Sequence, residues 1–229
     1  MDQSIRTYIA ELLGTFALVF IGTAVAVLSG FPDDHGPVKW LEISFAFGGT
    51  LMVLVWVIGP VSGCHLNPAV TIPMALSGRF KWSQVPGYVI AQVLGGIAAS
   101  AVLLMFMYGF GEKYEPIQLA ANGNAHDLNW VRLVGWELIL TAMFVFTIFA
   151  ATRDEAPPGF AALAIGGFLF LAHMVGAQLG DASLNPARSI GPALLERGGA
   201  LGVLWVFIVG PIAGGILGML FYKLVYKTK

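Results

Sequence analysis

A short motif that occurs twice constrains the fold of this chain more than any other feature. The stretch HLNPAVTIPMAL covers residues 65–76, and its near-copy SLNPARSIGPAL covers residues 183–194. Asparagine is a favourable residue at the N-cap of a helix, and proline at the first helical position loses no hydrogen bond. Each copy is therefore predicted to begin a helix at its Asn-Pro-Ala triplet. The triplet residues are Asn67, Pro68, Ala69, Asn185, Pro186 and Ala187.

Six segments of the chain are long and apolar enough to cross a membrane as helices. A crossing helix needs about 20 apolar residues. Of the 229 residues, 57% are hydrophobic and only 11% are charged, against about 25% charged in a soluble domain. The segments 66–76 and 184–194, which carry the triplets, reach only about halfway across, so we expect re-entrant half-helices. We predict an all-α membrane protein with crossing segments at 7–29, 41–59, 84–108, 131–151, 159–178 and 201–225.

The two halves of the chain repeat one pattern in opposite orientations. The offset in residue number between Asn67 and Asn185 also aligns Gly48 with Gly166, and ELLGTFALVF in the first span resembles ELILTAMFVF in the fourth. Each half has three spans and a half-helix, and an odd number of spans reverses the second half in the membrane. We expect a single domain over residues 1–229, with inverted repeats at about 7–108 and 131–226 linked by an external loop at 109–130.

Positive charge predicts the orientation of the spans, because short cytoplasmic loops carry an excess of lysine and arginine. On one side lie Arg6, Arg79, Lys81, Arg153, Lys223, Lys227 and Lys229. On the other side lie Lys39, Lys113, Arg132 and Arg197. We therefore expect an integral protein of the plasma (inner) membrane with both termini in the cytoplasm. The first apolar run is long and lacks a basic leading region and a cleavage site, which favours a retained span over a signal peptide.

The paired triplets also predict an electrostatic barrier. In an inverted repeat the two helix starts approach each other near the membrane midplane, and each carries about +0.5 elementary charge. Such a junction repels cations, while asparagine amides directed to its centre donate hydrogen bonds to a neutral molecule. The alternative is that each asparagine is only a helix cap. Loops that line a wet cavity would be supplied by the residues before the triplets. These residues are Gly63, Cys64, His65, Asp181, Ala182 and Ser183.

Arg188 is a charge without a counterpart in the repeat. It lies in the first turn of a half-helix, where a cation opposes the helix dipole, at a depth where charge is costly. Its equivalent in the first half is Val70, so the repeat does not require it. We expect a functional role for Arg188, and backbone carbonyls that tie down its guanidinium are compatible with that role.

The motifs SGCHLNPAV and NPARS, in a six-span inverted repeat, resemble those of the aquaporin (major intrinsic protein) family over essentially the whole chain. The resemblance implies an aquaporin-like bundle of six transmembrane helices plus two re-entrant half-helices in the lipid bilayer. It also implies a passive channel and not an enzyme, with water as the permeant, one pore per subunit and a homotetrameric assembly. The selectivity filter that it implies consists of Phe47, His173, Ala182 and Arg188.

Within that family, several residues are similar to those of water channels. A histidine at position 173 narrows the pore where glycerol facilitators carry glycine, and Ser189 and Ala193 are similar to water channels. Ile208 departs from the tryptophan more usual in that stretch, and Ala182 would leave the filter wider. A channel for glycerol or ammonia is therefore an alternative. An inverted-repeat secondary transporter and a membrane scaffold with a closed pore are two others.

Four further residues are candidates for a role at the site. The carboxylates Glu11 and Glu137 suit a proton relay or, as the resemblance supports, acceptors for the backbone of the re-entrant loops. Under the repeat offset Cys64 matches Ala182, which predicts a pore-facing thiol and a block by mercurials that Cys64→Ser relieves. Asp181 either caps its loop or orients Arg188.

We expect no metal, no cofactor and no nucleic-acid partner. His65 has no partner at a metal-ligand spacing, and its proximity to the triplet favours a role in ordering the loop. A formal net charge of −1 provides no electrostatic attraction to nucleic acid.

Overall fold

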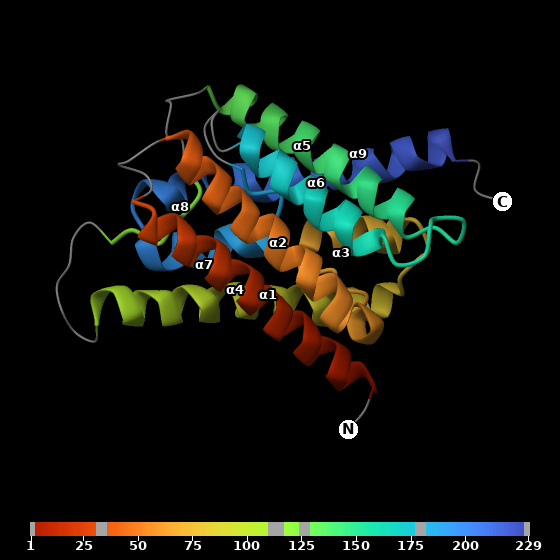
Figure 1. The fold of residues 1–229 in the computed structure, drawn as a ribbon, viewed down its shortest axis with the longest axis horizontal. Helices are drawn as coiled ribbons and strands as arrows, with labels where there is room; N and C mark the ends of the chain where they lie inside the picture. The colour runs from red at the N-terminus through yellow and green to blue at the C-terminus, as the bar shows by residue number, and fades with distance from the viewer. Residues whose placement is uncertain (1–2, 31–35, 110–116, 124–128, 177–181, 227–229) are drawn as a thin grey trace.

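The computed structural model describes residues 3–30, 36–109, 117–123, 129–176 and 182–226. Over these residues the chain forms a bundle of helices without any β-strand (Figure 1). In chain order the helices are α1 (Gln3–Leu28), α2 (Pro37–Ser62), α3 (Pro68–Leu76), the 3-10 turn η1 (Trp82–Gln84), α4 (Val85–Tyr108), α5 (Trp130–Ala151), α6 (Ala161–Gly176), α7 (Pro186–Glu196), α8 (Gly199–Val203) and α9 (Val206–Val225).

Proline and glycine mark several helix ends. Pro37, Pro68 and Pro186 begin α2, α3 and α7, where the missing N–H of proline costs no intrahelical bond. Helix α2 ends at Gly63, whose φ of 84° is left-handed and whose N–H donates to the Gly59 carbonyl. Glycine is the residue that adopts this C-terminal conformation without steric penalty. The chain therefore leaves α2 sharply and enters the loop that precedes α3.

Among the residues that the structure describes, five helical stretches are long and apolar enough to cross a membrane. They are α1, α2, η1 with α4, α5, and α8 with α9. Helix α6 has 16 residues and spans about 24 Å; residues 177 and 178 of the predicted segment lie outside the described part of the chain. The predicted fold class of an all-helical membrane protein is confirmed for the described residues.

The predicted crossing segment at 201–225 lies within the stretch Gly199–Val225, which is long and apolar enough to cross a membrane. A turn at Leu204 and Trp205 divides this stretch into α8 and α9. Apolar length reveals where a chain can enter a membrane. It does not reveal a two-residue turn that is itself made of apolar residues.

The bundle carries apolar side chains on its outside and two carboxylates, Glu11 and Glu137, in its interior. Leu13 of α1, Trp56 of α2 and Leu171 of α6 are 57%, 69% and 57% exposed, whereas Glu11 and Glu137 are completely buried. Soluble monomers rarely expose such extended apolar surface. The distribution fits an exterior in contact with lipid tails, which offer no partners for polar groups.

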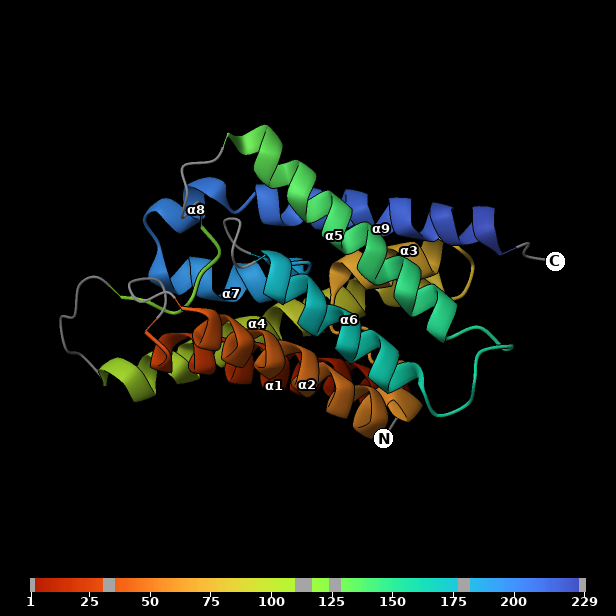
Figure 2. The same cartoon turned by 45° about the horizontal axis from the view of Figure 1, so that its top comes forward.

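Each half-helix packs against the last long helix of the other half of the chain. Helix α3 contacts α9, and α7 contacts α4, as Figure 2 shows. Glycine permits both approaches, because a Cβ at Gly215 would collide with the Ala69 carbonyl and a Cβ at Gly96 with the Ala187 carbonyl. Helices without a Cβ at the contact approach backbone to backbone. Both triplets are therefore held by the opposite half of the chain.

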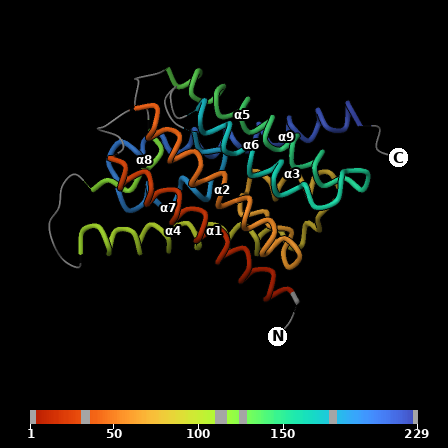
Figure 3. Tube along the Cα trace, viewed as in Figure 1, coloured from red at the N-terminus to blue at the C-terminus, as the bar shows by residue number. Residues whose placement is uncertain are grey.

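The beginning of α1 and the end of α9 lie toward the same end of the bundle (Figures 1 and 3). The end of α4 and the segment 117–123 lie toward the opposite end. Between these ends, α3 and α7 enter from opposite directions and meet with their N-termini near the middle.

Candidate pore and selectivity filter

An asparagine caps the first turn of each half-helix. The Asn67 side-chain oxygen accepts a hydrogen bond from the Ala69 N–H at 2.8 Å, and the Asn185 oxygen accepts one from the Ala187 N–H at 3.0 Å. The asparagines therefore cap α3 and α7 as their sequence position predicts. Both triplets adopt the same local geometry from opposite sides of the junction.

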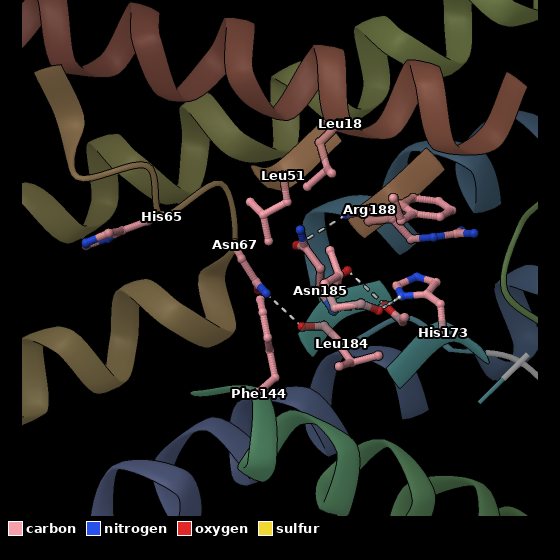
Figure 4. A pocket seen from close by; sticks show the side chains of 12 residues that line it. Leu18, Leu51, His65, Asn67, Phe144, His173, Leu184, Asn185 and Arg188 are labelled. Atoms are coloured by element: carbon pink, nitrogen blue, oxygen red, sulfur yellow. Dashed lines mark hydrogen bonds between the residues drawn. The ribbon is translucent and has the colours of Figure 1, made fainter. Parts of the chain in front are cut away.

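The amide nitrogens of the same two asparagines link the two halves. Asn67 Nδ2 donates to the Leu184 carbonyl at 2.7 Å (Figure 4). Asn185 Nδ2 donates to the Leu66 carbonyl at 2.9 Å. The sequence predicted amides directed to the centre of the pore. The structure uses one N–H of each amide to link the two halves, and the donation of a second N–H to a permeant stays a prediction.

Leu66 and Leu184 occupy a strained backbone conformation. Their φ angles are 52° and 55°, and both side chains are completely buried. A left-handed conformation in a branched residue costs of order 1–3 kcal/mol and persists only where the surroundings impose it. Here it places each leucine carbonyl opposite the asparagine of the other half.

The two buried carboxylates hold the loops before the triplets. Glu11 accepts hydrogen bonds from the N–H groups of His65 and Leu66 at 2.9 and 2.7 Å. Glu137 accepts equivalent bonds from the N–H groups of Ser183 and Leu184, also at 2.7 and 2.9 Å. Ser62 and Gln92 donate two further bonds to Glu11. These contacts favour the interpretation as loop acceptors over the proton relay.

A small cavity lies beside the junction. Its volume of about 20 Å³ is enough to hold roughly one water molecule. The polar lining consists of His65, Asn67, His173, Ser183, Asn185 and Arg188. The apolar lining consists of Leu18, Phe47, Leu51, Phe144, Leu169 and Leu184. A polar molecule in this cavity finds hydrogen-bond partners on only part of its perimeter.

Three of the four predicted filter residues meet at one side of this cavity. The Phe47 and His173 rings stack with their centroids 4.6 Å apart and an interplanar angle of 17°. The Arg188 guanidinium carbon lies 5.0 Å from the Phe47 ring centroid. An aromatic wall and two polar groups therefore converge, as Figure 4 shows for His173 and Arg188.

The hydrogen-bonding role of His173 follows from its neighbour. Its Nδ1 lies 2.9 Å from the Leu169 carbonyl, and a carbonyl only accepts, so Nδ1 of the neutral ring carries the proton. Nε2 is then a bare acceptor, and it has no partner among the described residues although it is buried. A molecule that donates a hydrogen bond satisfies it.

Arg188 is held by residues that the sequence did not single out. Its Nη1 donates to the Ala120 carbonyl and to the Asn122 side-chain oxygen, both at 2.9 Å. The expected backbone tie is therefore present at Ala120, together with a side-chain tie. Residues 117–123 come from the loop at 109–130, where the only sequence signal was a short apolar run, Leu119 to Ala121, within polar surroundings.

The remaining predicted site residues are placed as follows. His65 and Ser183 line the cavity, whereas Gly63, Cys64 and Ala182 do not belong to its lining. The Cys64 side chain is 7% exposed and packs in the apolar core. Its exposure to the pore on the cytoplasmic side, away from this cavity, stays a prediction.

Two further expectations concern ligands and Asp181. Asp181 lies outside the described residues. Within the described part of the chain, no group of three or more His, Cys, Asp or Glu side chains is arranged to hold a metal ion. His65 instead contacts Thr71, with Nδ1 3.2 Å from the hydroxyl oxygen. It also packs against the rings of Phe80 and Tyr88.

Comparisons with known proteins identify relatives over the whole length. The family model for the major intrinsic protein matches residues 1–222. Aquaporin Z of Rhodopseudomonas palustris is 44% identical, covering 94% of this chain and 91% of its own. Aquaporin Z of Bradyrhizobium diazoefficiens is 42% identical, covering 96% and 93%. The aquaglyceroporin structure from Plasmodium falciparum has a TM-score of 0.81 at 24% identity, covering 97% of this chain and 96% of its own. This last likeness concerns the fold, and it confirms the aquaporin-like bundle.

Proposed function

The chain belongs to the major intrinsic protein family, and on that premise we propose that it is a passive, water-selective membrane channel. Relatives named Aquaporin Z at 40% to 44% identity support this function. The observation that carries it is the small cavity at the meeting point of the two half-helices. Its volume of about 20 Å³ corresponds to roughly one water molecule, which implies passage in single file.

The junction favours a neutral permeant over a cation. Helices α3 and α7 point their N-termini at the cavity, and each contributes about +0.5 elementary charge there. Arg188, beside the same cavity, adds a full positive charge. The asparagine amides and the half-helix dipoles orient the oxygen of a water molecule toward the junction. A hydrated proton or metal cation meets a barrier at the same place.

Size and hydrogen bonding at the filter favour water over glycerol. Because the Phe47 ring stacks directly on His173, no solute passes between these two rings. The remaining opening is bounded by His173 Nε2 and the Arg188 guanidinium, which offer one acceptor and a set of donors. A water molecule satisfies both and is small. Glycerol needs a wider opening and an apolar wall for its carbon chain.

We extend the proposal to the oligomeric assembly of the protein and to its membrane location. An apolar exterior fits the lipid bilayer and also contacts between subunits, and we infer a homotetramer with one pore per subunit. The excess of basic residues at the end that carries both termini supports a cytoplasmic location for that end. The plasma membrane is the membrane in which such a channel would balance osmotic pressure.

Stopped-flow light scattering of proteoliposomes tests the function. In a sucrose gradient, vesicles that contain the protein should shrink much faster than protein-free vesicles. In a glycerol gradient they should shrink equally fast and regain volume only at the slow rate of the protein-free bilayer. Rapid recovery of volume in glycerol would instead identify a broader solute channel, and equal shrinkage with and without protein would identify a closed scaffold.

A further inference from the structure

Residues 117–123 form an ordered segment between the end of α4 and the half-helix α7. The Gln118 N–H donates to the Tyr108 hydroxyl at 3.0 Å. Glu196, the last residue of α7, accepts through Oε2 from the N–H groups of Leu119 at 2.7 Å and Ala121 at 3.2 Å. The segment is therefore attached to α4 at one end and to α7 by a carboxylate.

The two N–H groups bound to Glu196 flank the residue whose carbonyl holds Arg188. Ala120 has a φ of 53°, a left-handed conformation that is unusual for alanine. Its carbonyl accepts from Arg188 Nη1 at 2.9 Å. Fixing the N–H groups on both sides stabilises this conformation, so Glu196 acts on Arg188 through Ala120.

Asn122 makes the second attachment to the filter. Its Oδ1 accepts from Arg188 Nη1 at 2.9 Å and from the Ser189 hydroxyl at 2.6 Å. Two donors use both lone pairs of an amide oxygen. Its Nδ2 lies 3.4 Å from the carbonyl oxygen of Ala182, another predicted filter residue. The side chain is only 2% exposed, so water competes little for these bonds.

We propose that Asn122 and Glu196 are positioning residues of the selectivity filter, which fix the Arg188 guanidinium at the distance from Phe47 and His173 that excludes larger solutes. The proposal rests on the function as a water-selective channel and adds the residues that determine its selectivity. Asn122 holds the guanidinium directly. Glu196 holds the backbone that presents the second acceptor.

The physical reason is the freedom of an arginine side chain. Arg188 lies in the first turn of α7, and its backbone is fixed by the Asn185 cap. Its long side chain still has several rotatable bonds, and contacts of the guanidinium, among them its hydrogen-bond acceptors and the Phe47 ring, position the end of the side chain. Without the Asn122 acceptor, the guanidinium populates positions farther from His173. The opening then admits a larger solute in a fraction of the channels.

The ratio of glycerol to water permeability in proteoliposomes tests this role, because the ratio does not depend on how many channels fold or insert. The variants are Asn122→Ala and Glu196→Ala. Two matched controls lose a side-chain acceptor at the same end of the molecule without touching the filter. Asn129→Ala removes the cap of α5, and Glu42→Ala removes the acceptor of Ser29.

We expect the ratio to rise roughly threefold to tenfold in Asn122→Ala, the range that corresponds to the net loss of one ordinary hydrogen bond. A smaller rise is expected in Glu196→Ala, which acts through the backbone, and no rise in either control. Asn122→Asp keeps an oxygen acceptor of the same shape for Arg188 and Ser189. It should return the ratio toward the wild-type value, as Glu196→Gln should for the other site.

The wild-type measurement separates the two claims. If the wild type excludes glycerol and conducts water, but Asn122→Ala has the wild-type ratio, the positioning role is overturned while the channel function stands. A ratio that rises equally in Asn129→Ala also overturns it, because the effect is then one of general stability. If the wild type conducts no water, the proposed function fails and the inference fails with it.

Discussion

At the scale of single residues, the candidate pore depends on atoms whose donor or acceptor role is fixed by a neighbour. The Leu169 carbonyl makes His173 Nε2 an acceptor, and the Ala69 N–H fixes the orientation of the Asn67 amide. A permeant would therefore meet hydrogen-bond donors at the two asparagines and a hydrogen-bond acceptor at His173 Nε2. Such prepositioned groups replace the hydrogen bonds that a water molecule loses on leaving bulk solvent.

Replacement of His173 by glycine tests the filter at this scale. His173→Gly removes the ring that stacks on Phe47 and should raise the ratio of glycerol to water permeability roughly tenfold or more, as expected when a tight pocket loses a bulky side chain. Leu171→Gly is the matched control, since Leu171 lies on the same helix with its side chain 57% exposed. An unchanged ratio in His173→Gly would show that the constriction lies elsewhere.

The sequence indicates the site residues that the repeat or the family resemblance marks, and it does not indicate Asn122, which neither of them marks. Glu11 and Glu137, like the two triplets, stand at equivalent places in both halves, so each copy supports the other. Asn122 has no equivalent that the repeat reveals, and its loop resembles any polar connection. For Cys64, whose side chain packs in the apolar core, the exposure to the pore on the cytoplasmic side that the repeat predicts stays a prediction.

At the scale of helices, the two half-helices behave as one interrupted crossing. Their N-termini meet at the junction, and each is held from behind by a glycine of α4 or α9. The sequence predicted both half-helices, and α3 and α7 begin two residues later than the predicted segments because the preceding residues are left-handed or extended. Local propensity indicates where a helix begins. Tertiary hydrogen bonds determine the backbone conformation of the residues that precede the helix.

Alanine at Gly215 tests this packing. A Cβ there collides with the Ala69 carbonyl, and such overpacking costs typically about 1–3 kcal/mol. We expect Gly215→Ala to lower the thermal stability of the protein in detergent and to reduce water permeability. The control is Gly167→Ala on α6, where a Cβ meets no atom and a gain of about 0.5–1 kcal/mol is expected from the higher helix propensity of alanine. Equal stability of the two variants would contradict the close contact of α9 with the triplet.

At the scale of the whole molecule, equivalent elements of the two halves make equivalent contacts. Helix α1 packs on α4 as α5 packs on α9, and α2 packs on α6 between the halves. Gly48 and Gly166 face each other's carbonyls at that central contact. The inverted repeat with its two-part domain division, like the cytoplasmic position of the termini, stays a prediction. The arrangement explains how two short, individually incomplete helices form a single path through the bundle.

The most direct test of the central claim is a simultaneous measurement of water and proton flux through the wild-type protein. Proteoliposomes that contain a pH-sensitive dye are exposed to an osmotic gradient and, separately, to a pH gradient with a potassium ionophore to cancel the membrane potential. We expect osmotic shrinkage many times faster than in protein-free vesicles, with a proton flux equal to theirs. A proton flux that increases with the amount of protein, or shrinkage no faster than that of the bare bilayer, would contradict it.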